Sequence, residues 1–442
     1  MNSITLSFAN LLAETAARDY FAFGTLVLAF LFLALAIRAN RRKRLIDDTP
    51  TSKTKGIAIG FTEVKGSAES TEPLTSYLGE IDCVYYSFEV RERYSRTETD
   101  SDGKTSTKTG WKTVLEDTRC QNFYLKDDTG EVLVCPVGAE MKVKTTFSEK
   151  CGRHSELYYA KGPATAICDS DYVRKFVEKT IPIHENCYVL GQAKIRKDIV
   201  APKIAKSKNA PIYMISTKSE EELSSGYSIL FWVFMLLGLA GAATGGSLLA
   251  MTFGTPEKAT PYGVGATAIY LFLLFSSWSW MVYNSLVSLK HRLKQGCSNI
   301  DVQLKRRHDL IPQIVRVIKG YQKHEQETLE LVSFLRSQSQ ATIPGQQGND
   351  PEACLPTLKA LQENYPELKA NEQFKKLQSE LINTEQMIAL SREFYNEIVG
   401  YYNKRLGIFP DSFVAKILGL KRMNFFEIQS FERAVVKVKF KD

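Results

Sequence analysis

Residues 281–330 read MVYNSLVSLKHRLKQGCSNIDVQLKRRHDLIPQIVRVIKGYQKHEQETLE and join an apolar segment to a charged one without a loop signal. Apolar residues recur there at steps of three and four, which predicts a helix that packs on other helices. Asp309 and Pro312 form the pattern of a helix start, because Asp caps free N–H groups and Pro lacks one. We therefore expect a break near residues 307–309 and a new helix from Leu310. The two expected stripes are Leu286, Leu289, Leu293, Cys297, Ile300 and Leu304, then Ile311, Val315, Ile318, Tyr321, Thr328, Val332 and Leu335.

Several runs in this half of the chain resemble the LemA family. They are YNSLV at 283–287, IDVQLKRRHDLIP at 300–312, ENYPELKAN at 363–371 and EFYN at 393–396. The resemblance covers residues 280–427 and implies a membrane-tethered antiparallel helical bundle, with no established reaction. The motif residues that it marks as family or partner positions are Asp301, His308, Asp309, Pro312, Tyr321, His324, Tyr395 and Asn396.

Composition restricts the function. The chain has 442 residues and a net charge of +8, a surplus that membrane topology explains better than nucleic-acid binding does. Its eight cysteines form no C-x-x-C pair, and His324-Glu325 has no second His four residues on. We therefore expect no cofactor, no metal site, no catalytic residue and no nucleic-acid partner.

Three apolar segments predict transmembrane helices at residues 20–38, 227–253 and 262–289. Basic residues follow the first segment at 38–44 and the third at 290–294. By the positive-inside rule, the N-terminal segment 1–19 lies outside and the two large domains lie in the cytoplasm. The expected location is the inner or plasma membrane of a bacterium.

Residues 55–223 form a β-rich domain in this prediction. The run CVYYSFEV at 83–90 is aromatic and β-branched, and DDTG at 127–130 has the composition of a hairpin turn. Together with FYLKDDTG at 123–130 and ISTKSEEEL at 215–223, these runs resemble the GIDE-type domain of membrane-anchored ubiquitin ligases. Those ligases use a C-terminal RING, whereas here LemA-like sequence follows and supplies no paired zinc ligands.

The rest of the bundle, within residues 290–427, also has a clear pattern. The cleanest stripe comprises Phe374, Leu377, Leu381, Thr384, Ile388, Ser391, Tyr395, Ile398 and Tyr402. Asp411 then caps a short helix with Phe413, Val414, Ile417 and Leu418 on one face. That helix either lies on the membrane surface or closes the bundle. A tail follows at 428–442, and residues 435–440 alternate as in an edge strand.

Two groups are candidate binding residues. Lys305, Arg306 and Arg307 could contact an anionic lipid or a phosphate, or simply form a solvated face. Asp127, Asp128 and Gly130 could belong to a partner site, although Asp in such a turn more often binds its own backbone.

The fold class that we predict is an α+β membrane protein with three transmembrane helices, a barrel-like β domain and an antiparallel four-helix bundle. The expected function is that of a membrane-anchored scaffold or adaptor that forms homo-oligomers and contacts membrane lipid and an unknown protein partner. The alternative is a ubiquitin-ligase-like membrane protein or regulatory subunit whose GIDE-type domain binds a ligand or partner.

Overall fold

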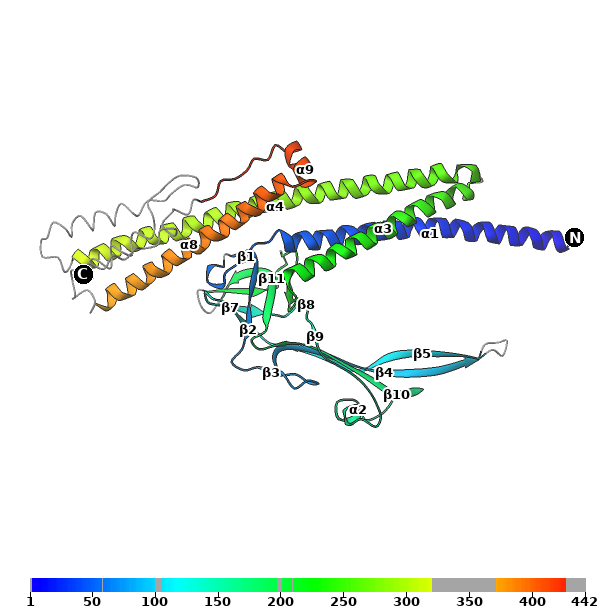
Figure 1. Cartoon of the computed structure of the whole chain (residues 1–442), viewed down its shortest axis with the longest axis horizontal. Coiled ribbons are helices and arrows are strands. Elements are labelled where there is room, and N and C mark those ends of the chain that lie inside the picture. Colours follow the sequence, from blue (N-terminus) through cyan, green and yellow to red (C-terminus); the bar gives the residue numbers. More distant parts are fainter. Residues whose placement is uncertain are drawn as a thin grey trace, which may run out of the picture. The chain divides into compact units, whose positions relative to one another are not determined.

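The structure is a computed structural model that describes residues 2–57, 59–99, 105–196, 201–208, 210–253, 255–319 and 371–426. Two compact units make up the chain. The β unit is Thr51–Ser219, and the helical unit combines Met1–Pro50 with Glu220–Asp442. Figure 1 shows both units coloured along the sequence.

Three long helices begin the helical unit. They are α1 (Asn2–Asp47), α3 (Glu220–Thr252) and α4 (Ala259–Lys319), with the short 3₁₀ helix η2 (Pro256–Lys258) before α4. Helix α3 packs against both α1 and α4. All three helices are long and apolar enough to cross a membrane, by length and composition. Their candidate spans are Tyr20–Asp47, Glu220–Thr252 and Pro256–Ile318.

The expected helix break near residues 307–309 is wrong, because α4 continues to Lys319 with Pro312 inside it. The buried stripe explains the continuity: Leu304, Arg307 and Ile311 follow one another on the covered face at steps of three and four. Pro312 removes one hydrogen bond to the carbonyl of His308, and both residues lie on the exposed face. Asp309 is therefore a mid-helix residue rather than a cap.

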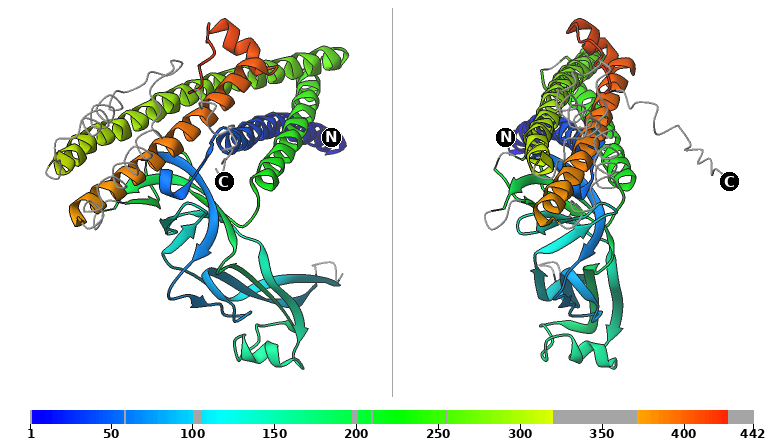
Figure 2. Two further views of the ribbon diagram at one scale, coloured as in Figure 1. Left: turned by 60° about the vertical axis from the view of Figure 1, so that its left-hand side comes forward. Right: turned by 90° about the vertical axis from the view of Figure 1, so that its left-hand side faces the viewer.

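Helix α8 (Glu372–Gly407) packs antiparallel along the second half of α4. Its first turns contact Ile311–Ile318, and its last turns contact Leu289–Leu304. Figure 2 shows the two helices side by side in both views. The predicted stripe is confirmed, since eight of its nine residues are buried and Leu377 is partly buried against the same core. Tyr321, His324, Thr328, Val332, Leu335 and the residues expected to form the third bundle helix and edge strand lie outside the described residues.

A short helix, α9 (Asp411–Ile417), follows α8. Pro410 occupies the N-cap position, so the expectation that Asp411 caps this helix is wrong. Val414 and Ala415 pack on Val282 and Leu286 of α4. Phe413, Ile417 and Leu418 remain exposed, so the four apolar residues do not share one covered face.

Five strands of the β unit close into a barrel in the order β2–β6–β7–β12–β11, because β11 also pairs with β2. Strands β1, β13 and β8 extend the same sheet. The strands are β1 (Thr51–Ser52), β2 (Gly60–Glu69), β6 (Phe123–Lys126), β7 (Glu131–Cys135), β8 (Glu140–Lys142), β11 (Asn186–Ile195), β12 (Pro202–Ala205) and β13 (Met214–Ser216), with the 3₁₀ helix η1 (Thr54–Gly56) after β1. The predicted barrel and its 127–130 hairpin turn are both present.

A second sheet curls into a half-barrel beside it. Its strands are β3 (Leu74–Thr75), β4 (Asp82–Thr99), β5 (Thr105–Cys120), β9 (Thr145–Gly152) and β10 (Ser170–Pro182), with the short helix α2 (Glu156–Ala160) after β9. Strand β4 lies between β5 and β10, and β9 pairs on the far side of β10. The sheet bends enough that Nζ of Lys150 on β9 lies 5.5 Å from the ring centre of Trp111 on β5.

Candidate functional site

The main polar site of the helical unit lies where α1 ends against α4, α8 and α9. Six side chains from these four elements meet there, and we call them the junction cluster: Arg44, Asp48, Ser285, Arg292, Arg405 and Asp411. Asp48 follows the last residue of α1, and its backbone N–H donates to the carbonyl of Arg44 at 2.9 Å. The end of the first candidate span is therefore bound directly to the bundle.

Asp411, at the start of α9, is held by two arginines. Both terminal nitrogens of Arg44 donate to its carboxylate at 3.2 Å, a bidentate pair. Nε of Arg405 lies 2.6 Å from the same carboxylate. The three side chains are only 8–16% exposed, so these ion pairs are largely withdrawn from water. Asp411 therefore connects α1 with the end of α8 and the start of α9.

Asp48 is the second carboxylate of the cluster. It accepts a hydrogen bond from Nη1 of Arg405 at 2.8 Å and a short one from Oγ of Ser285. Arg292 donates to the Asp48 carbonyl at 3.2 Å and to Oγ1 of Thr49 at 3.0 Å. Asp48 thus links the end of α1 to α4 and α8.

Burial shapes the electrostatics of both carboxylates. It raises the pKa of Asp48 to about 6, although the hydrogen bond from Ser285 and the charge of Arg44 act to lower it. Burial also raises the pKa of Asp411, against the charge and hydrogen bonds of Arg44. Removing one partner would leave a buried charge uncompensated, so the cluster holds four helices in one arrangement.

The three residues of the predicted basic run, 305–307, lie in two different environments. Lys305 and Arg306 are exposed on α4, but Arg307 is 1% exposed and faces α8, with Nη1 3.8 Å from Oε2 of Glu385. Arg307 therefore has a partner inside the bundle. Asp301, His308, Asp309 and Pro312 lie on the exposed face of the same helix. The lipid or phosphate role of Lys305 and Arg306 remains a prediction.

Tyr395 and Asn396 of α8 hold the segment that follows α9. The side-chain amide of Asn396 donates to the Phe426 carbonyl at 2.9 Å and accepts from the Phe426 N–H at 2.8 Å. Asn403, two turns further on, binds Met423 in the same way at 2.8 and 2.9 Å. The ring of Tyr395 meets that of Phe426 edge-on at 5.0 Å. These motif residues therefore fix a chain segment on the bundle.

Asp127 of the β unit organises its own turn. Its carboxylate accepts hydrogen bonds from the N–H groups of Thr54, Thr129 and Gly130 and from the hydroxyls of Thr54 and Thr129. Burial opposes the charge, but the bonds from Thr54 and Thr129 prevail and lower the pKa of Asp127 to about 2. Asp128 is exposed and lies 2.7 Å from the Lys53 ammonium. The turn joins β6 to β7 and supports the barrel.

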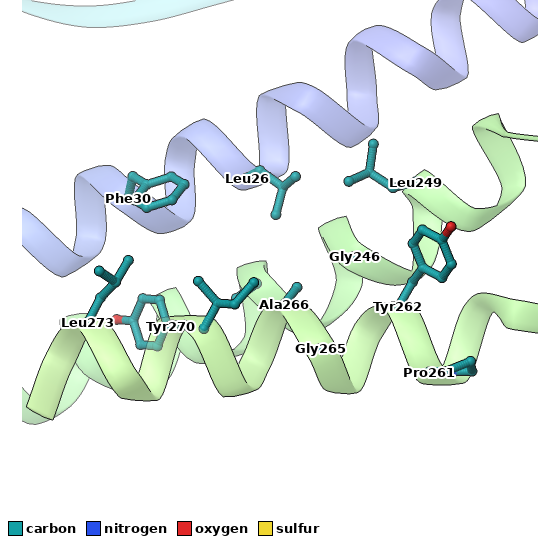
Figure 3. Close-up of a pocket in the computed structure, with 12 residues that line it drawn as sticks. Leu26, Phe30, Gly246, Leu249, Pro261, Tyr262, Gly265, Ala266, Tyr270 and Leu273 are labelled. Carbon is teal, nitrogen blue, oxygen red and sulfur yellow. The ribbon is translucent and has the colours of Figure 1, made fainter.

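An apolar pocket of about 470 Å³ opens between α1, α3 and α4. Figure 3 shows Leu26 and Phe30 of α1 facing Ala266, Tyr270 and Leu273 across it. Gly265 leaves room there, since a Cβ at that position would meet no atom within 4 Å, whereas the missing side chain of Gly246 lets α3 approach α4 closely. The phenol of Tyr270 already donates to the Met235 carbonyl at 3.4 Å. Such a lining suits an apolar chain and supplies no group for a reaction. Within the described ranges, no three His, Cys, Asp or Glu residues gather as metal ligands would.

The sequence contained a weak signal for the junction cluster. Arg44 and Arg292 stand out only as topogenic charges, and Asp411 only as a helix cap. Asp48, Ser285 and Arg405 carry no motif at all. Their meeting depends on the tertiary packing of segments more than 200 residues apart.

Comparison with known proteins identifies two regions. A model described as LemA family matches residues 296–440, and a GIDE model described as E3 Ubiquitin ligase matches residues 92–245. Both resemblances read from the sequence are confirmed, with limits shifted toward the C-terminus.

Individual relatives match about two fifths of the chain. Protein LemA of Metamycoplasma hominis is 25% identical over 190 residues, which cover 41% of this chain and 87% of that protein. Magnetosome protein MamQ of Magnetospirillum gryphiswaldense is 23% identical over 215 residues, covering 40% and 79%. Magnetosome protein MamQ 2 of Paramagnetospirillum magneticum is 23% identical over 218 residues, covering 41% and 79%.

Proposed function

Because residues 296–440 belong to the LemA family and residues 92–245 to the GIDE domain, we propose that this chain is a membrane-anchored scaffold or adaptor. It crosses the membrane three times, with the N-terminus outside and both units in the cytoplasm, in the inner or plasma membrane of a bacterium. It forms homo-oligomers there and recruits a protein partner. Membrane lipid is its other contact.

The junction cluster is the observation that carries this proposal. Asp48 and Arg44, at the end of α1, bind Arg405 and Asp411 of the bundle. A bundle joined to a candidate membrane helix by buried ion pairs has a fixed orientation relative to that helix. A scaffold needs such a fixed orientation to present one surface to neighbours along a membrane.

The proposed topology follows from the distribution of basic residues and can be tested directly. With three crossings, the basic residues within 38–44 and 290–294 fall on one side of the membrane. Lys258 is the only basic residue of the short connection between α3 and α4. A cysteine at Ser106 should resist a membrane-impermeant reagent in intact cells, whereas one at Glu257 should react. Both positions are exposed in the protein. Labelling at Ser106 before lysis would contradict the topology.

The oligomer is tested by counting chains. The full-length protein would be extracted from its membrane directly into polymer-bounded discs and weighed by native mass spectrometry. The scaffold proposal expects two or more chains in a disc, held together at nanomolar total protein. One chain per disc at every concentration would contradict it. Proteins that co-purify in fixed ratio would name the partner.

A second function is favoured by the edge of the half-barrel. Within the described residues, β5 pairs only with β4, so its other edge is open along an exposed 16-residue strand. An open edge can add an extended peptide as a further strand. In this alternative the chain is a regulatory or ubiquitin-ligase-like subunit whose GIDE domain binds a protein. Thr109→Pro would block the edge, and selective loss of a co-purified protein would favour it over the scaffold.

A further inference from the structure

The turn between α8 and α9, together with α9 itself, carries large apolar side chains that stay exposed in the described part of the chain. We define the α8–α9 tip by five of them, whose exposed fractions are 47% for Ile408, 82% for Phe409, 55% for Phe413, 70% for Ile417 and 38% for Leu418. We propose that this tip inserts into the headgroup layer of the membrane, next to the helices that cross it. The proposal rests on the membrane crossing proposed above.

The short helix α9 has apolar groups on two sides. Val414 and Ala415 are buried against Val282 and Leu286 of α4, which fixes α9 on the bundle. Phe413 and Ile417 therefore project elsewhere and stay uncovered. A soluble surface rarely gathers such a patch without a binding partner or a membrane.

The depth of the tip follows from the junction cluster. Asp411, the first residue of α9, binds Arg44, which is seven residues beyond Ile37, the last apolar residue of the predicted first span. At a rise of about 1.5 Å per residue, seven residues of α1 cover about 10 Å. The headgroup layer on each side of a bilayer is about 5–8 Å thick. With the reach of an Arg side chain, the start of α9 lies at or next to that layer.

Aromatic residues of α4 support the same depth for α9 in the membrane. Trp280 is 69% exposed and Tyr283 39% exposed, on either side of Val282, which α9 covers. Trp278 packs into the same cluster as Val414. Trp and Tyr concentrate at the boundary between lipid and water, because their rings have an apolar body and a polar edge. Helix α9 is thus fastened to the part of α4 that carries an aromatic belt.

Charge favours lipid over a protein as the occupant. Lys416, Lys421 and Arg422 are exposed around the tip, and the sequence from 412 to 426 contains no acidic residue. Asp411 and Asp48, the two carboxylates of the junction cluster, are buried with Arg44 and Arg405. Basic residues beside an apolar patch suit an interface that contains anionic lipid.

Photocrosslinking of the full-length protein in nanodiscs of phosphatidylcholine and phosphatidylglycerol tests the proposal. p-Benzoylphenylalanine would replace Phe409, Phe413 or Ile417 one at a time. Phe272, 68% exposed within the third predicted span, is the control for membrane crossing, and Lys376, exposed on α8, is the control for water. We expect lipid adducts by mass spectrometry at the three tip positions and at 272, and none at 376.

The other outcomes are distinct. Adducts at 272 without any at 409, 413 and 417 would overturn the tip proposal and leave the membrane crossing intact. Adducts that join two copies of the chain at the tip would overturn it in favour of an oligomer contact. Absence of lipid adducts at 272 would refute the crossing and the tip together.

Lipid charge gives a second test on the folded protein. Lys421→Gln with Arg422→Gln should lower the lipid adduct yield at Phe413 by about tenfold in discs rich in phosphatidylglycerol. The same pair of substitutions should leave the yield at Phe272 unchanged. Equal tip yields in the variant and the parent, or equal yields with and without phosphatidylglycerol, would show that the basic residues do not direct the tip to anionic lipid.

Discussion

The two halves of α4 pack by opposite rules, although they form one continuous helix. In residues 259–289 the helix meets α3 through small residues: a Cβ on Gly246 of α3 would lie 2.6 Å from the Tyr262 carbonyl oxygen and 2.7 Å from Cβ of Ala266. In residues 290–319 it meets α8 through large aliphatic side chains. Leu293, Ile300, Leu304, Ile311, Ile314 and Ile318 are all buried there.

The membrane crossing proposed above would account for the contrast, because it places the two halves in different solvents. Lipid tails are as apolar as Leu, so helices in a bilayer gain little by burying large side chains and associate by close backbone approach. In water, the same burial is the main driving force for folding. This contrast is what the proposed membrane crossing predicts, and large side chains of α4 are already buried against α8 and α9 from Val282 onward, close to the junction cluster.

The largest effect is expected at the junction. Asp411→Asn should remove the carboxylate that Arg44 and Arg405 share and destabilise the docking of α9 and the end of α8 by about 3–5 kcal/mol. Hydrogen exchange of the amides of residues 395–417 in nanodiscs measures this loss. Asp309→Asn, 61% exposed on α4, is the control and should change exchange by less than about 0.5 kcal/mol. Equal exchange in both variants would show that the Asp411 carboxylate does not hold α9 and the end of α8 in place.

The contrast between the halves also shows which features the sequence could predict. The stripe from Phe374 to Tyr402 has a regular period, so its burial followed from local pattern alone. The predicted break at Asp309 is wrong, because capping and helix-start signals are weak preferences that the packing of Leu304 and Ile311 on α8 overrides. A periodic apolar stripe involves many residues of one helix face, whereas a capping signal depends on a single residue.

The candidate site was far less accessible from sequence. Asp48 is an ordinary acidic residue after a basic run, and Ser285 is one of several serines near the end of the third apolar segment. Each has a sufficient local explanation, so nothing in the pattern requires a partner. Only the fold brings residues 44, 48, 285, 405 and 411 together, because α9 turns back onto α4 after α8 ends.

The packing of residues 290–319, the second half of α4, is tested by creating a cavity. Leu381 is 0% exposed and packs with Ile311, Ile314 and Phe374, so Leu381→Ala should destabilise the bundle by about 2–5 kcal/mol. Lys376→Ala, exposed on the same helix, should change stability by less than about 0.5 kcal/mol. Exchange of amides in residues 372–388 gives both values. If the two substitutions had the same effect, the α4–α8 seam would be assigned wrongly. If Leu381→Ala only dissolved an oligomer, the seam would be intermolecular.

The packing of residues 259–289, the first half of α4, is tested by adding volume. Gly246→Ala places a methyl group against the Tyr262 carbonyl and Ala266, so α3 and α4 must separate. Overpacking of this kind destabilises by about 1–3 kcal/mol. The midpoint of thermal unfolding in nanodiscs, followed by amide exchange in residues 240–270, should fall. An unchanged midpoint would mean that small residues do not determine the approach of these two helices.

The smallest effect, and one of opposite sign, is expected at the neighbouring glycine of α4. Gly265 also lines the pocket, but a Cβ there would meet no atom within 4 Å. Ala is a better helix former than Gly because it loses less backbone freedom on folding, so Gly265→Ala should stabilise the helix by up to about 1 kcal/mol. The same thermal measurement in nanodiscs compares it with Gly246→Ala. Opposite shifts would show that the contact between α3 and α4 is tight at Gly246 and that Gly265 faces open space. A fall in both midpoints would mean that the pocket is filled, and an acyl chain retained in it would then be found by lipid extraction of the washed protein.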